Sequence, residues 1–153
     1  MLSLHPARLT DAFDLCRNCF PEQSLNEVKD YLRWCINQQA KGRMVRLVAE
    51  TDSQVVANGQ LTILHDRGEI GSLVVAAPCR RRGIGTALVQ ALIEKAREHN
   101  VHTLEISARA DMPWIQAWYR RLGFVFQGNH TFPDQEQVVM LQMVLTSHDK
   151  ESQ

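Results

Sequence analysis

The sequence predicts a single-domain α/β (α+β) fold, in which one mixed, mainly antiparallel sheet of about seven strands is flanked by about four helices. Two observations lead to this prediction. Helix-like patterns come first, three strand-like runs follow, and helices and strands then alternate along the chain. The chain has 153 residues, the size of one domain with a continuous core. We expect one domain over residues 1–146 and a flexible C-terminal tail over residues 147–153.

The first part of the chain is predicted to form a short strand and two helices. Residues 2–8 alternate in the manner of a strand. A helix beginning at Thr10 is expected to end before Pro21. Ser24 begins a second helix, and Glu27 completes a capping box three residues later. Apolar residues recur with helical spacing on one face of this helix, at Val28, Tyr31, Leu32 and Cys35.

The rest of the chain is dominated by strand-like patterns. Three successive runs with strand periodicity are joined by short polar turns, and a helix–strand–helix sequence follows. Pro113 falls in the first turn of the last predicted helix, where its missing N–H has no cost, and Gly123 ends that helix. The predicted strands cover residues 44–50, 54–64, 69–76, 101–107, 124–127 and 137–145, and the helices end at about residues 99 and 123.

Charge and hydropathy exclude several classes of partner. Lys and Arg together number 17, as do Asp and Glu, so the formal net charge is zero and gives no indication of nucleic-acid binding. No apolar run approaches the roughly 20 residues that span a membrane. The first residues lack the basic-then-apolar order of a signal peptide. We therefore expect a cytoplasmic protein with no nucleic-acid or membrane partner.

The cysteines raise the question of a metal or redox site. Cys16 and Cys19 have C-x-x-C spacing, but no second such pair and no suitably spaced histidine pair follows. The pair also lies within a predicted helix, whereas a redox motif stands at a strand-to-helix turn. We predict reduced, structural thiols and no metal.

Three arginines and two glycines occupy the point where a strand gives way to a helix, at residues 80–85. A helix start offers unpaired N–H groups and the positive end of the helix dipole, and glycines let an anion approach the backbone. The same residues also fit a solvated basic turn. Two nucleotide-binding patterns are excluded, because no Lys follows Gly85 as in a P-loop and Leu88 stands where the Rossmann fingerprint needs glycine.

The pattern formed by Arg80, Gly83 and Gly85 resembles the acyl-CoA pyrophosphate loop of the GNAT N-acetyltransferase superfamily, Q/R-x-x-G-x-G/A. An apolar strand precedes it and an amphipathic helix follows it, as in that family. Downstream, the stretch WYRRLGF at residues 118–124 is similar to the family's YEKLGF-type segment. The element order over residues 2–145 also fits, so the resemblance covers nearly the whole chain.

The resemblance implies that acetyl-CoA is the cosubstrate, with its pyrophosphate on this turn. It further implies that the main chain of the strand before the turn pairs with the pantetheine arm. A backbone N–H there would donate to the carbonyl oxygen that gains negative charge. The implied cofactor-binding residues are Leu73, Val74, Val75, Arg80, Arg81, Arg82, Gly83, Ile84, Gly85 and Thr86.

Two catalytic residues follow from the resemblance. Tyr119 matches the general acid that protonates the departing thiolate, although spacing alone also fits a core aromatic. Glu69, 11 residues before Arg80, matches the glutamate base of histone-type members. Glu105 on the next strand and an ordered water are alternatives to Glu69. Met112 departs from the family, many of whose members have asparagine seven residues before the tyrosine.

The sequence thus predicts an acetyl-CoA-dependent N-acetyltransferase, an acyltransferase that moves an acetyl group directly to a primary amine. A non-catalytic acyl-CoA-binding or sensing module is the alternative. The acceptor is a small-molecule or peptide amine that the sequence does not single out. We expect its pocket between the first two helices and residues 129–136, with Phe20, Tyr31, Trp34 and Phe132 nearby. A homodimer is also open, because similar proteins commonly dimerise.

Overall fold

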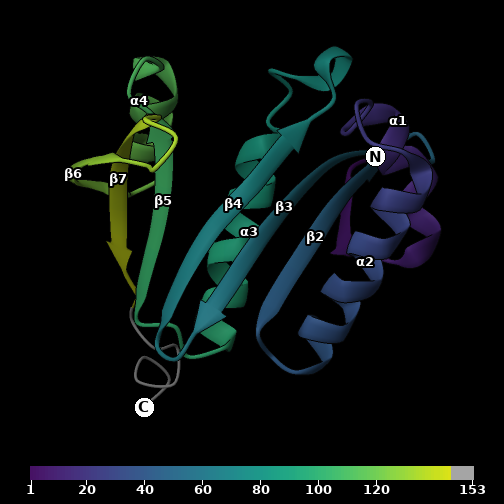
Figure 1. Ribbon diagram of the computed structural model, residues 1–153, viewed down its shortest axis with the longest axis horizontal. Coiled ribbons are helices and arrows are strands. Elements are labelled where there is room, and N and C mark those ends of the chain that lie inside the picture. The colour runs from purple at the N-terminus through teal and green to yellow at the C-terminus, as the bar shows by residue number, and fades with distance from the viewer. Residues whose placement is uncertain (146–153) are drawn as a thin grey trace.

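The computed structural model describes residues 1–145, which form a seven-stranded mixed sheet in the order β1-β2-β3-β4-β5-β7-β6 (Figure 1). Four helices pack on it, so the predicted fold class is confirmed. The expected tail at residues 147–153 lies outside the described residues. The elements, with η marking a 3-10 helix, are β1 (Ser3–Pro6), η1 (Leu9–Asp11), α1 (Ala12–Asn18), α2 (Leu25–Ala40), β2 (Met44–Thr51), β3 (Gln54–Leu64), β4 (Arg67–Val75), η2 (Ala77–Cys79), α3 (Ile84–Glu98), β5 (Thr103–Arg109), α4 (Pro113–Arg121), β6 (Val125–Thr131) and β7 (Gln137–Val144).

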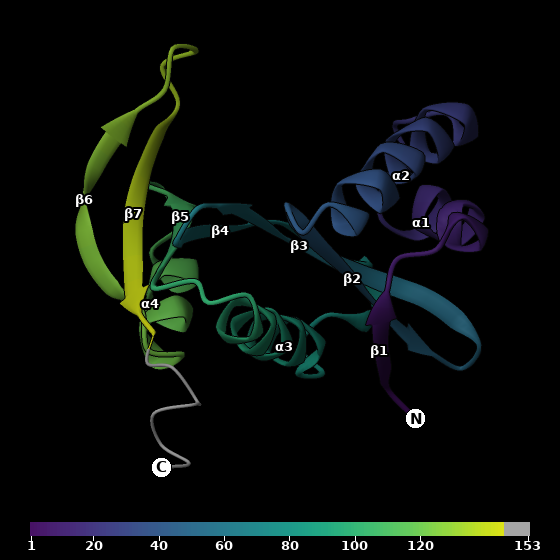
Figure 2. The ribbon, with the colours of Figure 1, turned by 90° about the horizontal axis from the view of Figure 1, so that it is seen from below.

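The helices cover both faces of the sheet, with α1 and α2 on one side and α3 on the other (Figure 2). The larger core lies between the sheet and α3, where Leu88 and Leu92 are completely buried, and it also takes in the buried ring of Tyr119 from α4. A smaller core lies under α1 and α2 and includes Leu15 and Leu32. No helix within residues 1–145 has the length and apolar character needed to cross a bilayer.

The parallel pair β4 and β5 separates part of the way along its length. These strands pair only from Arg67 opposite Thr103 to Ile70 opposite Ile106. Beyond this point β4 continues to Val75 without a partner on its β5 side among the described residues. Figure 1 shows the two strands close at one end and well apart at the other. The unpaired main-chain edges that face this gap are free to hydrogen-bond to a ligand.

A bulge in β4 lies where the strands begin to diverge. Asn58 of β3 pairs with Val74 whereas Gln60 pairs with Gly71, so β4 has one more residue than β3 in this stretch. Ser72 takes a left-handed conformation there, with φ of 52°. The completely buried Asn58 supports the bulge, because its Nδ2 donates to the carbonyl oxygen of Ser72 at 2.7 Å.

Several predicted boundaries differ from the structure. The helix expected from Thr10 begins as η1, because the main-chain N–H of Arg8 donates to the carboxylate of Asp11 at 2.8 Å. The capping box of Ser24 and Glu27 is confirmed. The strand expected over residues 124–127 extends to Thr131 as β6. Val28, Tyr31 and Leu32 share one face of α2, as predicted, and Tyr31 is 42% exposed because it lies at the rim of a cavity.

Candidate active site

The first turn of α3 presents main-chain donors without an internal cap. Gly83 occupies the N-cap position in a left-handed conformation, with φ of 79°, and no side chain caps the helix. The first helical hydrogen bond runs from Ala87 N to Gly83 O. The N–H groups of Ile84, Gly85 and Thr86 therefore remain available within the described chain, at the positive end of a helix of 15 residues.

A cavity of about 410 Å³ lies against this turn. It brings together seven of the ten predicted cofactor-binding residues, whereas Leu73, Val74 and Arg82 lie outside its lining. Arg80 also donates from Nε to the carbonyl oxygen of Val75 at 3.0 Å, which ties the turn to the end of β4. The lining residues are Val75, Cys79, Arg80, Arg81, Gly83, Ile84, Gly85, Thr86, Trp118 and Arg121.

The two glycines of the turn serve different purposes. Gly83 needs its left-handed backbone, and a Cβ there would meet nothing within 4 Å. A Cβ on Gly85 would lie 3.2 Å from the Trp118 ring, so glycine at this position lets the indole pack on the helix start. Trp118 Nε1 also donates to Thr86 Oγ1 at 2.9 Å. The α4 helix is thereby joined to the first turn of α3.

The charge around the cavity is positive. Arg80, Arg81 and Arg121 line it, and none of its lining residues within the described chain is acidic. Sequence reasoning missed Trp118 and Arg121 as part of this site. The only signal in the sequence is their spacing of three, which places both on one face of α4. A cavity with this charge and with free main-chain donors can hold a phosphate or pyrophosphate group.

Tyr119 lies one residue beyond Trp118, on the helix that follows the open end of β5. Its side chain is 6% exposed, and its ring packs on those of Trp118 and Phe124 at centroid distances of 5.1 and 6.2 Å. Burial raises the pKa of Tyr119 to about 12. The hydroxyl makes no hydrogen bond within residues 1–145. Every fully buried side-chain oxygen or nitrogen in these residues does make one, so this hydroxyl is not fully buried. The hydroxyl therefore reaches an accessible surface while the ring stays in the core.

The two predicted candidates for the base lie directly opposite each other. Glu69 of β4 pairs with Glu105 of β5, one residue before the last pair that precedes the gap. Their neighbours Ile70 and Ile106 pack in the core beside α3, so both carboxylates project from the other face of the sheet. Arg67 forms an ion pair with Glu105, whereas Glu69 is exposed and has no ion-pair partner within the described chain.

Met112 occupies the N-cap position of α4 and makes no side-chain capping hydrogen bond. The α4 helix begins at Pro113, as predicted, with the proline in its first turn. Met112 therefore cannot supply the amide hydrogen bonds that asparagine would supply at this point.

A second cavity, of about 370 Å³, lies between α1, α2 and the bulge of β4. It lies beside the first two helices, where the acceptor was expected, and Phe20 and Tyr31 line it, but none of residues 129–136 does. Trp34 and Phe132 are 49% and 38% exposed and do not contribute to its lining. Its polar lining consists of Gln23, Glu27, Arg46 on β2 and Ser72 on β4. Sequence reasoning missed Arg46, which is 2% exposed.

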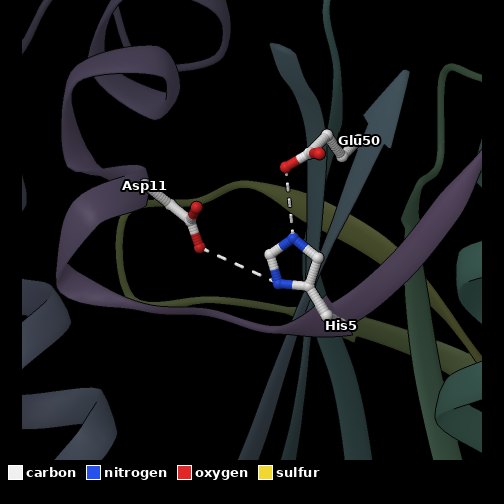
Figure 3. A group of neighbouring side chains, drawn as sticks. All are labelled: His5, Asp11 and Glu50. Carbon is white, nitrogen blue, oxygen red and sulfur yellow. Dashed lines mark ion pairs between the residues drawn. The ribbon is translucent and has the colours of Figure 1, made fainter. Parts of the chain in front are cut away.

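His5, Asp11 and Glu50 are the one group within residues 1–145 whose spacing suits a metal ion (Figure 3). His5 lies 4.0 Å from Asp11 and 3.5 Å from Glu50. Arg8 is the fourth member, since its Nη2 lies 3.2 Å from His5 Nε2, 3.3 Å from Asp11 Oδ1 and 3.7 Å from Glu50 Oε1. The guanidinium of Arg8 therefore already offsets one of the two negative charges in this group.

The cysteines of the C-x-x-C stretch are not bonded to each other, and all four cysteines are free thiols, as predicted. Burial raises the pKa of the Cys19 thiol to about 11. Cys16 instead donates from Sγ to the carbonyl oxygen of Gln23 at 3.3 Å. Cys19 therefore packs in the core under α1, and Cys16 ties this helix to the segment that follows it.

Several solved acetyltransferases share this fold. The ribosomal-protein-alanine N-acetyltransferase of Brucella melitensis is 25% identical, with a TM-score of 0.78 over 94% of this chain and 99% of that one. RimL, a ribosomal L7/L12 alpha-N-protein acetyltransferase in complex with coenzyme A, has a TM-score of 0.82 at 17% identity over 94% of each chain. The yncA protein of Salmonella typhimurium, with its cofactor acetyl-CoA, has a TM-score of 0.76 at 16% identity over 97% and 96%.

The fold shared with solved acetyltransferases, together with the matching family model, defines the class of protein as an acyltransferase. The chain belongs to the acetyltransferase (GNAT) family, whose model matches residues 9–124. A search among curated protein sequences returned no match.

Proposed function

We propose that this protein is an acetyl-CoA-dependent N-acetyltransferase that transfers the acetyl group directly from the thioester to a primary amine. The observation that carries the proposal is the position of the arginine-lined cavity, at the α3 N-terminus and beside the gap between β4 and β5. The coenzyme A and acetyl-CoA bound to structural neighbours support the same cosubstrate.

The residues at the cavity fit the pyrophosphate of acetyl-CoA. Gly83 leaves open space over the helix start, and the first-turn N–H groups face it with no internal cap. Thr86 accepts a hydrogen bond from Trp118, which leaves its hydroxyl proton free to donate. When bound, acetyl-CoA supplies the activated acetyl group. Arg80 and Arg81 would hold its phosphates while the unpaired edge of β4 aligns the pantetheine arm.

Main-chain N–H groups of residues 73–75 would stabilise the acetyl oxygen as it gains negative charge. Tyr119 would donate a hydrogen bond to the sulfur as it departs. Its pKa of about 12 lies above the roughly 8.5 of a thiol, so the hydroxyl stays protonated at neutral pH. Full proton transfer from such a weak acid is unfavourable, and a hydrogen bond to the sulfur accounts for its role better.

The amine approaches from the face of the sheet that carries Glu69 and the second cavity. Glu69 would accept the amine proton, and its exposed position favours transfer through water. Arg67 pairs with Glu105, so Glu69 is the one of the two carboxylates that is free to contact the amine.

The proposal is tested by a screen of primary amines that follows release of the CoA thiol from acetyl-CoA. We expect release that depends on the amine and an acceptor that gains an acetyl group. If acetyl-CoA binds but no amine in a broad panel accelerates release, a binding module replaces the transferase.

A further inference from the structure

The cavity between α1, α2 and β4 contains a buried cation with no anion beside it. Arg46 on β2 is 2% exposed, and its Nε and Nη1 donate to Asn58 Oδ1 and Gln60 Oε1, both at 2.7 Å. Its Cζ stands 4.8 Å from the centroid of the Tyr31 ring. Arg46 Nη1 also donates to Cys35 Sγ at 3.9 Å. None of these four partners is a carboxylate, and no carboxylate within residues 1–145 forms an ion pair with Arg46.

The titratable neighbours of Arg46 do not supply the missing charge. Burial raises the pKa of Cys19 to about 11, and it also raises the pKa of Cys35 and of Tyr31. These groups are therefore protonated and neutral at physiological pH. Burial lowers the pKa of Arg46, but a guanidinium in a protein keeps its proton. The cavity thus retains an uncompensated positive charge, which is costly unless a ligand neutralises it.

One arm of the guanidinium remains available. Arg46 Nη2 makes no hydrogen bond within the described chain. Every fully buried side-chain nitrogen in residues 1–145 does make one, so Nη2 is not fully buried. The atom therefore reaches the cavity, whose lining includes Arg46. Glu27 is an acidic residue that also lines this cavity, but its side chain is exposed to solvent. Its Oε1 accepts a hydrogen bond of 3.2 Å from Ser24 N in the capping box and forms no ion pair with Arg46.

We propose that Arg46 binds the carboxylate of the acceptor, and that the acceptor is a small amino acid-like amine with an apolar side chain. This rests on the proposed function. The cavity volume of about 370 Å³ suits a small molecule. Its remaining wall includes Leu15, Phe20, Val28 and Leu32, which offer an apolar surface to the acceptor's side chain.

The cavity also lies beside the proposed site of acetyl transfer. Ser72 lines it at the bulge, next to the main chain of residues 73–75 that would hold the acetyl oxygen. A carboxylate on Arg46 would place the amine of the same molecule near this part of β4. A polyamine, by contrast, would bring further positive charge toward a buried guanidinium. Arg46 therefore selects for amino carboxylates and against polycations.

The test compares phenylalanine, leucine and methionine with their carboxamides, which lack the negative charge, and with spermidine. Binding is measured by calorimetry without acetyl-CoA, and turnover by release of CoA. We expect wild-type protein to prefer each acid to its amide by about tenfold or more, the scale of one charge-assisted hydrogen bond. Arg46→Gln should reduce this ratio to about one, and Arg46→Lys should keep part of it.

The ratio separates recognition from structural support of the bulge. Loss of support for Asn58 would lower the rates for acid and amide alike and leave their ratio unchanged, and that result would overturn the proposal. Turnover of amines with no preference for the carboxylate would also overturn it while the proposed function stands. Arg46-dependent binding of the acids without release of CoA would uphold the binding site and contradict the proposed function. Absence of both binding and turnover of the acids would contradict the carboxylate site.

Discussion

The indole nitrogen of Trp118 donates a hydrogen bond of 2.9 Å to the hydroxyl of Thr86, and this contact joins α4 to the first turn of α3. The two residues are 32 positions apart in the sequence, and both line the cavity assigned to the pyrophosphate. The same indole packs against Gly85, so it fixes the position of the main chain that would bind the anion.

Replacement of Trp118 by phenylalanine should therefore weaken acetyl-CoA binding severalfold. The variant loses the hydrogen bond to Thr86, which contributes about 1 kcal/mol of stability. Trp114→Phe is the matched control, since Trp114 lies on the same helix and is 64% exposed. Calorimetric titration with acetyl-CoA measures both. Equal affinities for the two variants would show that the indole does not organise the site.

Replacement of Gly83 by alanine should reduce both stability and acetyl-CoA affinity. Alanine at a φ of 79° costs about 1 kcal/mol, and the new side chain occupies space over the helix start. Gly42→Ala carries the same backbone strain, at a φ of 71° with no atom near its Cβ, but lies away from the cavity. Urea denaturation should find similar losses of stability in the two variants, and only Gly83→Ala should bind acetyl-CoA more weakly. If both variants retain wild-type affinity, the turn does not hold the pyrophosphate.

Arg121 should contribute to phosphate binding although the sequence pattern does not include it. Arg121→Ala removes one charge from the lining, and we expect the dissociation constant to rise by about tenfold or more. Arg120 precedes it on α4, is exposed and lies outside the lining, so Arg120→Ala should bind as wild type does. The difference between the two should shrink in high salt, because screening weakens contacts with phosphate. A dissociation constant unchanged in Arg121→Ala would remove this residue from the site.

Stability should fall at alkaline pH because Cys19 is buried. Its pKa in the folded protein is about 11, against a usual value of 9.0. Between these values only the unfolded chain releases the thiol proton, so the free energy of unfolding decreases as pH rises, by at most about 3 kcal/mol from this group. Cys19→Ala should lose less stability than wild type between about pH 8 and pH 11.

Urea denaturation of wild type and Cys19→Ala at about pH 8 and pH 11 measures this difference in the loss of stability. Cys16→Ala provides the control, because Cys16 lies at the edge of α1 and donates to a main-chain carbonyl. A Cys19→Ala protein whose stability declines as steeply as that of wild type would contradict the assignment.

Local patterns were sufficient to predict the parts of the molecule that depend on neighbouring residues. The capping box of Ser24 and Glu27 and the turn at Gly83 involve residues within one or two helical turns of each other. The contact between Trp118 and Gly85 depends instead on how α4 packs on α3, and no periodicity reports it. Arg46 likewise reads as an ordinary residue of a strand until the position of α2 over β2 is known, because α2 buries it.

We propose that acetyl transfer takes place beside the hydroxyl of Tyr119, and the turnover number of the Tyr119→Phe variant measures whether that hydroxyl takes part. The substitution removes only an oxygen without a hydrogen-bond partner in the described chain, so the fold and acetyl-CoA affinity should persist. With saturating acetyl-CoA and an accepted amine at neutral pH, we expect kcat to fall by about 10²-fold or more, the loss typical of removing one hydrogen-bond donor to developing negative charge. A kcat equal to that of wild type would contradict it.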